Sequence, residues 1–83
     1  MNNYAVIFTY SFDDEVAVYL FDTEEEAKKF LKDNFEEEIR IDTEENGWDC
    51  NWSIEDDGRY AVIFNRFNDK VDTTTMRIGN VYP

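Results

Sequence analysis

Carboxylates dominate the chemically active side chains of this chain, and histidine is absent from it. Twenty aspartates and glutamates stand against eight lysines and arginines, which gives a net charge of −12. Without histidine the usual general base, the commonest metal ligand and every Ser-His or Cys-His pair are missing. Carboxylate pairs can perform acid–base catalysis, but in so acidic a chain close pairs arise by chance. We therefore predict no enzymatic activity, no catalytic residues and no cofactor.

The lone cysteine and the glycines do not indicate a catalytic or metal site either. Cys50 follows Asp49, which raises the pKa of its thiol, so we predict a buried small hydrophobe rather than a nucleophile. The three glycines are too scattered for a phosphate-binding loop. Residues 42–49 follow the first half of a calcium loop, but Ser53 stands where such a loop needs a bidentate glutamate. We predict no dedicated metal site and leave weak calcium binding as a third possibility.

The acidic residues are concentrated in the middle of the chain. Residues 36–57 carry ten acids and a single base, Arg40, and so hold −9 of the net charge of −12. A coat that served solubility alone would be spread more evenly. Such a segment repels DNA, RNA and anionic lipid and attracts basic protein surfaces, so we expect a protein partner with a basic surface, no direct nucleic-acid binding and no membrane binding. The candidate partner-binding residues are Glu36, Glu37, Asp42, Glu44, Glu45, Asp49, Asp56 and Asp57.

The elements that must position these side chains follow from apolar periodicity. Residues 4–10 and 15–21 read as a strand pair, and residues 48–55, 59–67 and 71–78 read as three further strands. The last strand is rich in threonine, and we expect it at an edge of the sheet. The order ββαβββ predicts an α+β fold in one domain, residues 1–83, with a single antiparallel sheet of four to five strands and one helix packed on one face.

A single helix begins at Thr23, but its end is ambiguous. Thr23 followed three residues later by Glu26 is a capping box, and apolar residues then recur at helical spacing as far as Phe35. Glu38 falls in the middle of the apolar face, where an unpaired carboxylate is costly. Either the helix stops near Glu37, or its last turns overhang the sheet and end at residues 46–47.

The two faces of the predicted sheet differ in character. One face is small and aliphatic, with Ile7, Val18, Ala61 and Ile63 among its residues, and the other carries aromatics such as Phe8, Tyr19 and Phe64. We expect the helix on the aliphatic face, which leaves the aromatic face to be closed by sheet curvature and residues 36–57, or by another molecule. Trp48 and Trp52 are predicted to be buried.

Two functions remain for a protein of this kind. In the first, the acidic segment imitates a run of phosphates and blocks a basic nucleic-acid-binding enzyme, by analogy with inhibitors of the anti-restriction or anti-CRISPR type. In the alternative, the chain is a homodimeric or scaffolding module that uses its aromatic sheet face, and acidity serves solubility. Residues 1–4 show no export signal, and one cysteine fits a reducing compartment, so we expect a cytoplasmic protein.

Overall fold

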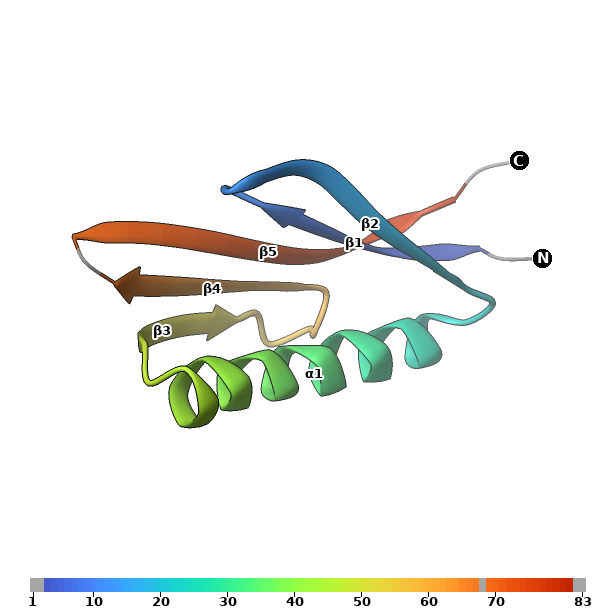
Figure 1. Ribbon diagram of the computed structural model, residues 1–83. Helices are drawn as coiled ribbons and strands as arrows, with labels where there is room; N and C mark the ends of the chain where they lie inside the picture. Colours follow the sequence, from blue (N-terminus) through green and yellow to red (C-terminus); the bar gives the residue numbers. More distant parts are fainter. Residues whose placement is uncertain (1–2, 68, 82–83) are drawn as a thin grey trace.

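The α+β architecture expected from the sequence is confirmed by a computed structural model, which describes residues 3–67 and 69–81. Five antiparallel strands form one sheet in the order β2-β1-β5-β4-β3, and one helix packs across it (Figure 1). Its elements are β1 (Tyr4–Tyr10), β2 (Asp13–Phe21), α1 (Glu24–Arg40), η1 (Ile41–Glu45), β3 (Asp49–Ile54), β4 (Tyr60–Phe67) and β5 (Lys70–Asn80).

The last strand lies at the centre of the sheet, so its predicted place at an edge is wrong. β5 pairs with β1 on one side and with β4 on the other, and the edges are β2 and β3. The threonines that suggested an edge instead suit a central strand, because β-branched side chains pack well on a pleated surface. Thr74 is buried, and Thr73 and Thr75 on the opposite face are half-buried.

The start of the helix follows the predicted capping pattern. The Thr23 hydroxyl accepts a hydrogen bond from the backbone N–H of Glu26 at 3.2 Å and donates one to the Glu26 carboxylate at 3.0 Å. These contacts satisfy one of the free N–H groups of the first turn. Ala27, Leu31 and Phe35 then follow at helical spacing and are buried against the sheet.

The helix does not stop near Glu37 but continues to Asn46, which confirms the longer alternative, whereas the predicted overhang beyond the sheet is wrong. α1 passes directly into the π-helical turn η1, which Asn46 closes by donating its N–H to the Ile41 carbonyl at 3.0 Å. Gly47 then takes a positive φ of 67°, a conformation that glycine adopts without steric cost. The added turn stays packed on the sheet, because Asp42 is buried against β4.

The helix packs on the aromatic side of β1 and β2 but on the aliphatic side of β4, so the predicted assignment of the two faces is wrong for the first hairpin and right for β4. Ala61 and Ile63 are buried beneath the helix, as predicted. In the first hairpin the Phe30 ring lies 4.9 Å from the Tyr19 and Phe21 rings, measured between centroids. Aromatic side chains have the most apolar area to remove from water, and the helix supplies an aromatic partner for them. In β1 and β2, covering the larger side chains therefore outweighs the easier fit on the small ones.

The face turned away from α1, called here the open face, carries aliphatic residues on β2 and an aromatic ring on β4. Val16, Val18 and Leu20 of β2 are each more than half exposed, and Phe64 and Val71 lie on the same face of β4 and β5. Because the helix covers the other face, an interaction through a face of the sheet would use this open face.

The two tryptophans are more exposed than predicted. Trp52 shares the helix-side face of the sheet with Ile63, its partner in register, yet it is 52% exposed because β3 is an edge strand. Trp48, just before β3, is 36% exposed. Cys50, between them in sequence, is half-buried against the core, and burial followed by the charges of Asp42 and Glu38 raises the pKa of its thiol.

Candidate binding surface

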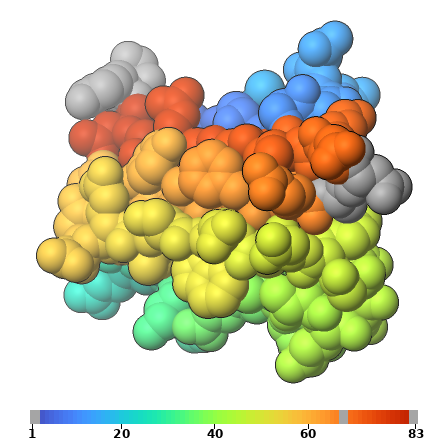
Figure 2. Space-filling view, turned by 90° about the vertical axis from the view of Figure 1, so that its left-hand side faces the viewer, coloured from blue at the N-terminus to red at the C-terminus, as the bar shows by residue number. Residues whose placement is uncertain are grey.

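The acidic middle of the chain runs along one side of the molecule. Figure 2 shows the segment from η1 through β3 to the β3–β4 turn crossing a single face, with the end of the helix at the lower right. Seven of the eight predicted partner-binding carboxylates are exposed, and they fall into three places, listed here in chain order: Glu36, Glu37, Glu44 and Glu45 at the end of the helix, Asp49 at the start of β3, and Asp56 and Asp57 in the β3–β4 turn.

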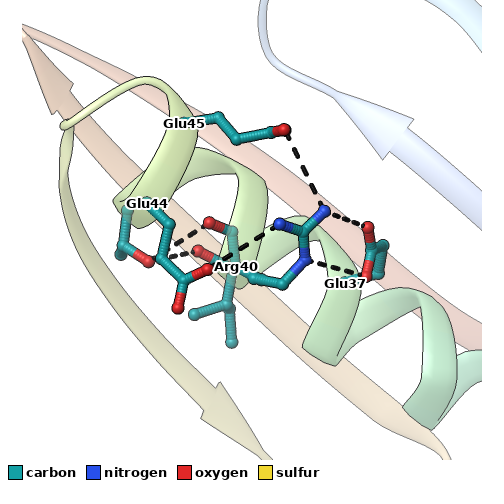
Figure 3. A network of polar contacts seen from close by, with 6 residues as sticks. Glu37, Arg40, Glu44 and Glu45 are labelled. Carbon is teal, nitrogen blue, oxygen red and sulfur yellow. Dashed lines mark hydrogen bonds and ion pairs between the residues drawn. The ribbon is translucent and has the colours of Figure 1, made fainter.

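Three of these carboxylates surround one guanidinium at the C-terminal end of the helix, and Glu36 lies beside them in sequence. The Arg40 Nη2 lies 2.5 Å from the Glu37 carboxylate and 4.0 Å from that of Glu45, and its Nη1 lies 3.7 Å from Glu44 (Figure 3). The helix brings them together because residues three and four apart share a face. We call Glu36, Glu37, Glu44 and Glu45 the acidic end.

The charge of the acidic end is not balanced locally. Arg40 forms two hydrogen bonds with Glu37, which lower the pKa of that carboxyl group below its ordinary value. Glu44 and Glu45 reach Arg40 only as longer contacts and keep side-chain exposures of 68% and 59%. The C-terminus of a helix already carries about half a negative charge from its free carbonyl groups. The acidic end therefore combines a helix terminus with carboxylates of the same sign, an arrangement that weakens the helix and strengthens the negative potential outside it.

Asp42 cannot contact a partner as predicted, because it is only 2% exposed. Its Oδ2 accepts a hydrogen bond of 2.6 Å from the side-chain amide of Asn65 on β4. The continuous helix explains this burial, since Asp42 follows Leu31, Phe35 and Glu38 on the same face. Sequence reasoning missed Asn65 as its partner. Asn65 follows Ala61 and Ile63 at every second position of β4 and so lies on the same buried face of the strand.

The other predicted carboxylates lie away from the acidic end. Asp49 lies on the open face, opposite Arg66 in the register of β3 and β4. The turn with Asp56 and Asp57 lies at the far end of β3, beside the first half of α1, where Arg59 pairs with Glu24 at 3.2 Å. The structure thus keeps the exposed carboxylates of residues 36–57 on one side of the molecule but separates them into three places, at the end of the helix, along β3 and in the β3–β4 turn.

Comparison of the chain with profiles of known protein families, with curated proteins and with solved structures finds no match. Within residues 3–67 and 69–81, no helix has both the length and the apolarity needed to cross a membrane. The same residues contain no group of three or more cysteine or carboxylate side chains arranged to hold a metal ion. Any inference about function therefore rests on the geometry of the surface itself.

Proposed function

We propose that this protein binds a partner with a basic surface through the acidic end. The observation that supports this most directly is the placement of exposed glutamates at the negative end of a helix dipole, with one arginine among them. A helix selected for stability alone would carry cations there. The unfavourable arrangement is understandable if the negative potential serves an oppositely charged partner, since complementary charge speeds association and selects the partner.

The more specific form of the proposal is an inhibitor that imitates a polyanion. From Glu36 to Glu45 the carboxylates spread over about 13 Å, at about 1.5 Å of rise per residue. Lysines and arginines that hold phosphates in a nucleic-acid groove do not depend on base sequence, so fixed carboxylates can compete for them. The proposed partner is thus a basic nucleic-acid-binding enzyme, for example a restriction or CRISPR nuclease.

Charge reversal tests the proposal. The tagged wild-type chain is used to capture proteins from the lysate of its native host at low salt, beside a variant with Glu44→Lys and Glu45→Lys. A variant with Asp22→Lys and Glu25→Lys makes the same change in net charge at exposed positions around the start of α1, at the other end of the helix from the acidic end. We expect the wild type and this control variant to capture the same basic protein and the acidic-end variant to lose it.

Two further measurements distinguish an inhibitor that occupies a nucleic-acid groove from an acidic protein that attracts basic proteins non-specifically. Duplex DNA added to the capture should displace the partner from the wild-type chain, because both occupy the same groove. Binding should also weaken steeply as salt rises. The proposal is rejected if the variant with Glu44→Lys and Glu45→Lys still captures the partner. It is also rejected if neither added DNA nor added salt reduces capture by the wild-type chain.

A second candidate function is self-association, which the exposed apolar residues of the open face favour. Val16, Val18 and Leu20 form a continuous aliphatic row along β2, and an apolar patch of this kind commonly marks an interface. Two copies packed through their open faces would form a sandwich, with the acidic ends on the outside. Sedimentation velocity at micromolar concentration distinguishes the two: a dimer that Val18→Asp dissociates supports this candidate, and a monomer rejects it.

A further inference from the structure

A cavity of about 240 Å³ opens beside the acidic end, between the end of the helix and the sheet. Its walls come from the β1–β2 turn, α1, the segment before β3, β4 and β5, and are formed by Phe12, Glu38, Trp48, Asn65, Asp72 and Thr74. Sites for small-molecule ligands usually have volumes of about 300–1,000 Å³. The cavity is therefore of a size suited to a single side chain.

The polar groups of this cavity are mainly hydrogen-bond acceptors. Glu38 and Asp72 contribute carboxylates, and no lysine or arginine is among the described residues that line it. Phe12 and Trp48 add aromatic rings, which attract cations through their faces. Carboxylates beside aromatic rings suit an organic cation, and the described part of the chain contains no group of three or more cysteine or carboxylate side chains arranged to hold a metal ion.

One acceptor in this cavity is buried and unused. Asn65 is 5% exposed, and its Oδ1 has no hydrogen-bond partner among the described residues. Asn65 is one of the residues that line the cavity, and its Nδ2 already donates to Asp42, so Oδ1 is the group of this amide that remains without a partner among the described residues. Buried acceptors are nearly always paired in folded proteins. A hydrogen-bond donor supplied from outside the chain would give the Asn65 Oδ1 atom a partner.

The surroundings of Glu38 point to the same kind of ligand. Burial, followed by the nearby charge of Asp42, raises the pKa of the Glu38 carboxyl group above its ordinary value. The neighbouring groups on the other elements are Tyr10 of β1, Cys50 of β3 and Asp72 of β5, and none of these is a cation. A positive group in the cavity would offset the charge that burial and Asp42 now penalise.

We propose that this cavity receives an arginine side chain of the basic partner. The guanidinium group presents five donors in a plane and stacks on aromatic rings, which matches carboxylates, an unused amide oxygen and the rings of Phe12 and Trp48. The inference rests on the proposed function, because the partner that docks on the acidic end supplies the arginine. It adds a specific anchor to a contact that is otherwise made by exposed charges alone.

The test uses the whole chain and two small peptides. Acetyl-Gly-Arg-Gly-amide is titrated into the ¹⁵N-labelled protein while the side-chain amide of Asn65 and the indole N–H of Trp48 are followed by NMR. The control peptide carries citrulline, the neutral isostere of arginine. We expect saturable shifts of both signals with the arginine peptide, with a millimolar Kd, and none with the citrulline peptide.

Two variants locate the site. Glu38→Gln combined with Asp72→Asn removes both charges from the cavity and should weaken the arginine peptide about tenfold or more. Asp22→Asn combined with Glu25→Gln removes the same charge around the start of α1, at the other end of the helix, and should leave the peptide affinity within about twofold, because those side chains are solvent-exposed. The comparison of the two peptides on the wild-type chain needs no variant, so it decides the matter even if a cavity variant folds poorly.

The outcomes separate this inference from the proposed function. Equal shifts with both peptides, or an Asn65 signal that neither peptide moves, overturn the arginine site and leave water as the partner of the amide. If the arginine peptide does not bind while the acidic-end reversals abolish partner capture, the arginine site is wrong and the proposed function stands. If the peptide binds the cavity while those reversals leave capture intact, the proposed function fails and the cavity remains an arginine site.

Discussion

At the scale of single residues, the hydrogen bond between Asn65 and Asp42 holds a carboxylate inside the protein. Asn65→Ala removes the donor and leaves the buried Asp42 carboxylate unpaired, which should lower the free energy of unfolding by about 2–3 kcal/mol. Urea denaturation at pH 7 followed by circular dichroism measures this. The matched control is Asn51→Ala on the exposed face of β3, expected to change stability by less than about 0.5 kcal/mol. Equal losses in the two variants would show that Asp42 does not depend on the amide.

Glu38 belongs to the same scale and predicts a stability that depends on pH. Its pKa in the folded protein lies above the ordinary 4.5, so protonation favours the folded state. This contribution is present below the ordinary pKa and is lost as pH rises through the folded value. Glu38→Gln should therefore stabilise the protein at pH 7 by about 0.5–1 kcal/mol and give no gain at about pH 4.

Urea denaturation at the two pH values measures the effect, with Glu36→Gln, an exposed neighbour, as the control that should change little at either. A destabilised Glu38→Gln variant at pH 7 would contradict the penalty assigned to this carboxylate. The same variant is expected to bind the arginine peptide more weakly, so the predicted gain in stability comes with a loss of affinity.

At the scale of elements, the packing of α1 on the aromatic face can be tested with one pair of truncations. Phe30→Ala removes the ring that contacts Phe8, Tyr19 and Phe21, and should cost about 3 kcal/mol of stability. Val18→Ala, on the open face, should cost less than about 1 kcal/mol because that side chain remains in contact with water. Thermal unfolding of both variants measures the difference. A larger loss of stability for Val18→Ala than for Phe30→Ala would contradict the packing of α1 against Phe8, Tyr19 and Phe21.

The sequence was enough to predict the elements but not their arrangement in space. Period-two and helical patterns identified five strands and one helix, and Thr23 marked the start of the helix correctly. The choice of covered side was right for β4 and wrong for β1 and β2, because alternation gives each strand two sides without saying which side gains more from burial or how the sides of different strands align. The place of β5 was wrong because strand order depends on long-range pairing, which a threonine-rich pattern does not specify.

The candidate site was predictable only in part, for a related reason. The excess of acids in residues 36–57 is a local property and could be read directly, whereas the burial of Asp42 depends on how far the helix continues. The cavity was not predictable at all, because its walls come from residues as distant in sequence as Phe12 and Thr74. The sequence contained one indication of the cavity: Asn65 is polar, although Ala61 and Ile63 on the same face of β4 are apolar.

At the scale of the whole molecule, the net charge of −12 should make stability depend on salt. The screening length falls from about 30 Å at 0.01 M salt to about 3 Å at 1 M, which relieves repulsion among carboxylates that folding brings together. We expect the melting temperature to rise by about 4–8 °C, equivalent to about 1 kcal/mol. Calorimetry in sodium chloride measures this. The melting temperature of the Glu44→Gln, Glu45→Gln variant should rise less with salt. An equal rise would mean that repulsion within the acidic end does not lower the stability of the fold.

The central position of β5 also affects how the chain is made. β1 and β2 form one hairpin and β3 and β4 another, and the strand that joins them within the sheet is the last of the five to be synthesised. Until residues 70–80 leave the ribosome, the two hairpins are tethered only through the helix and display the unpaired backbone edges on which β5 will later lie. Completion of the sheet therefore falls late in translation, and a nascent chain cut short before this strand would be an open, aggregation-prone intermediate.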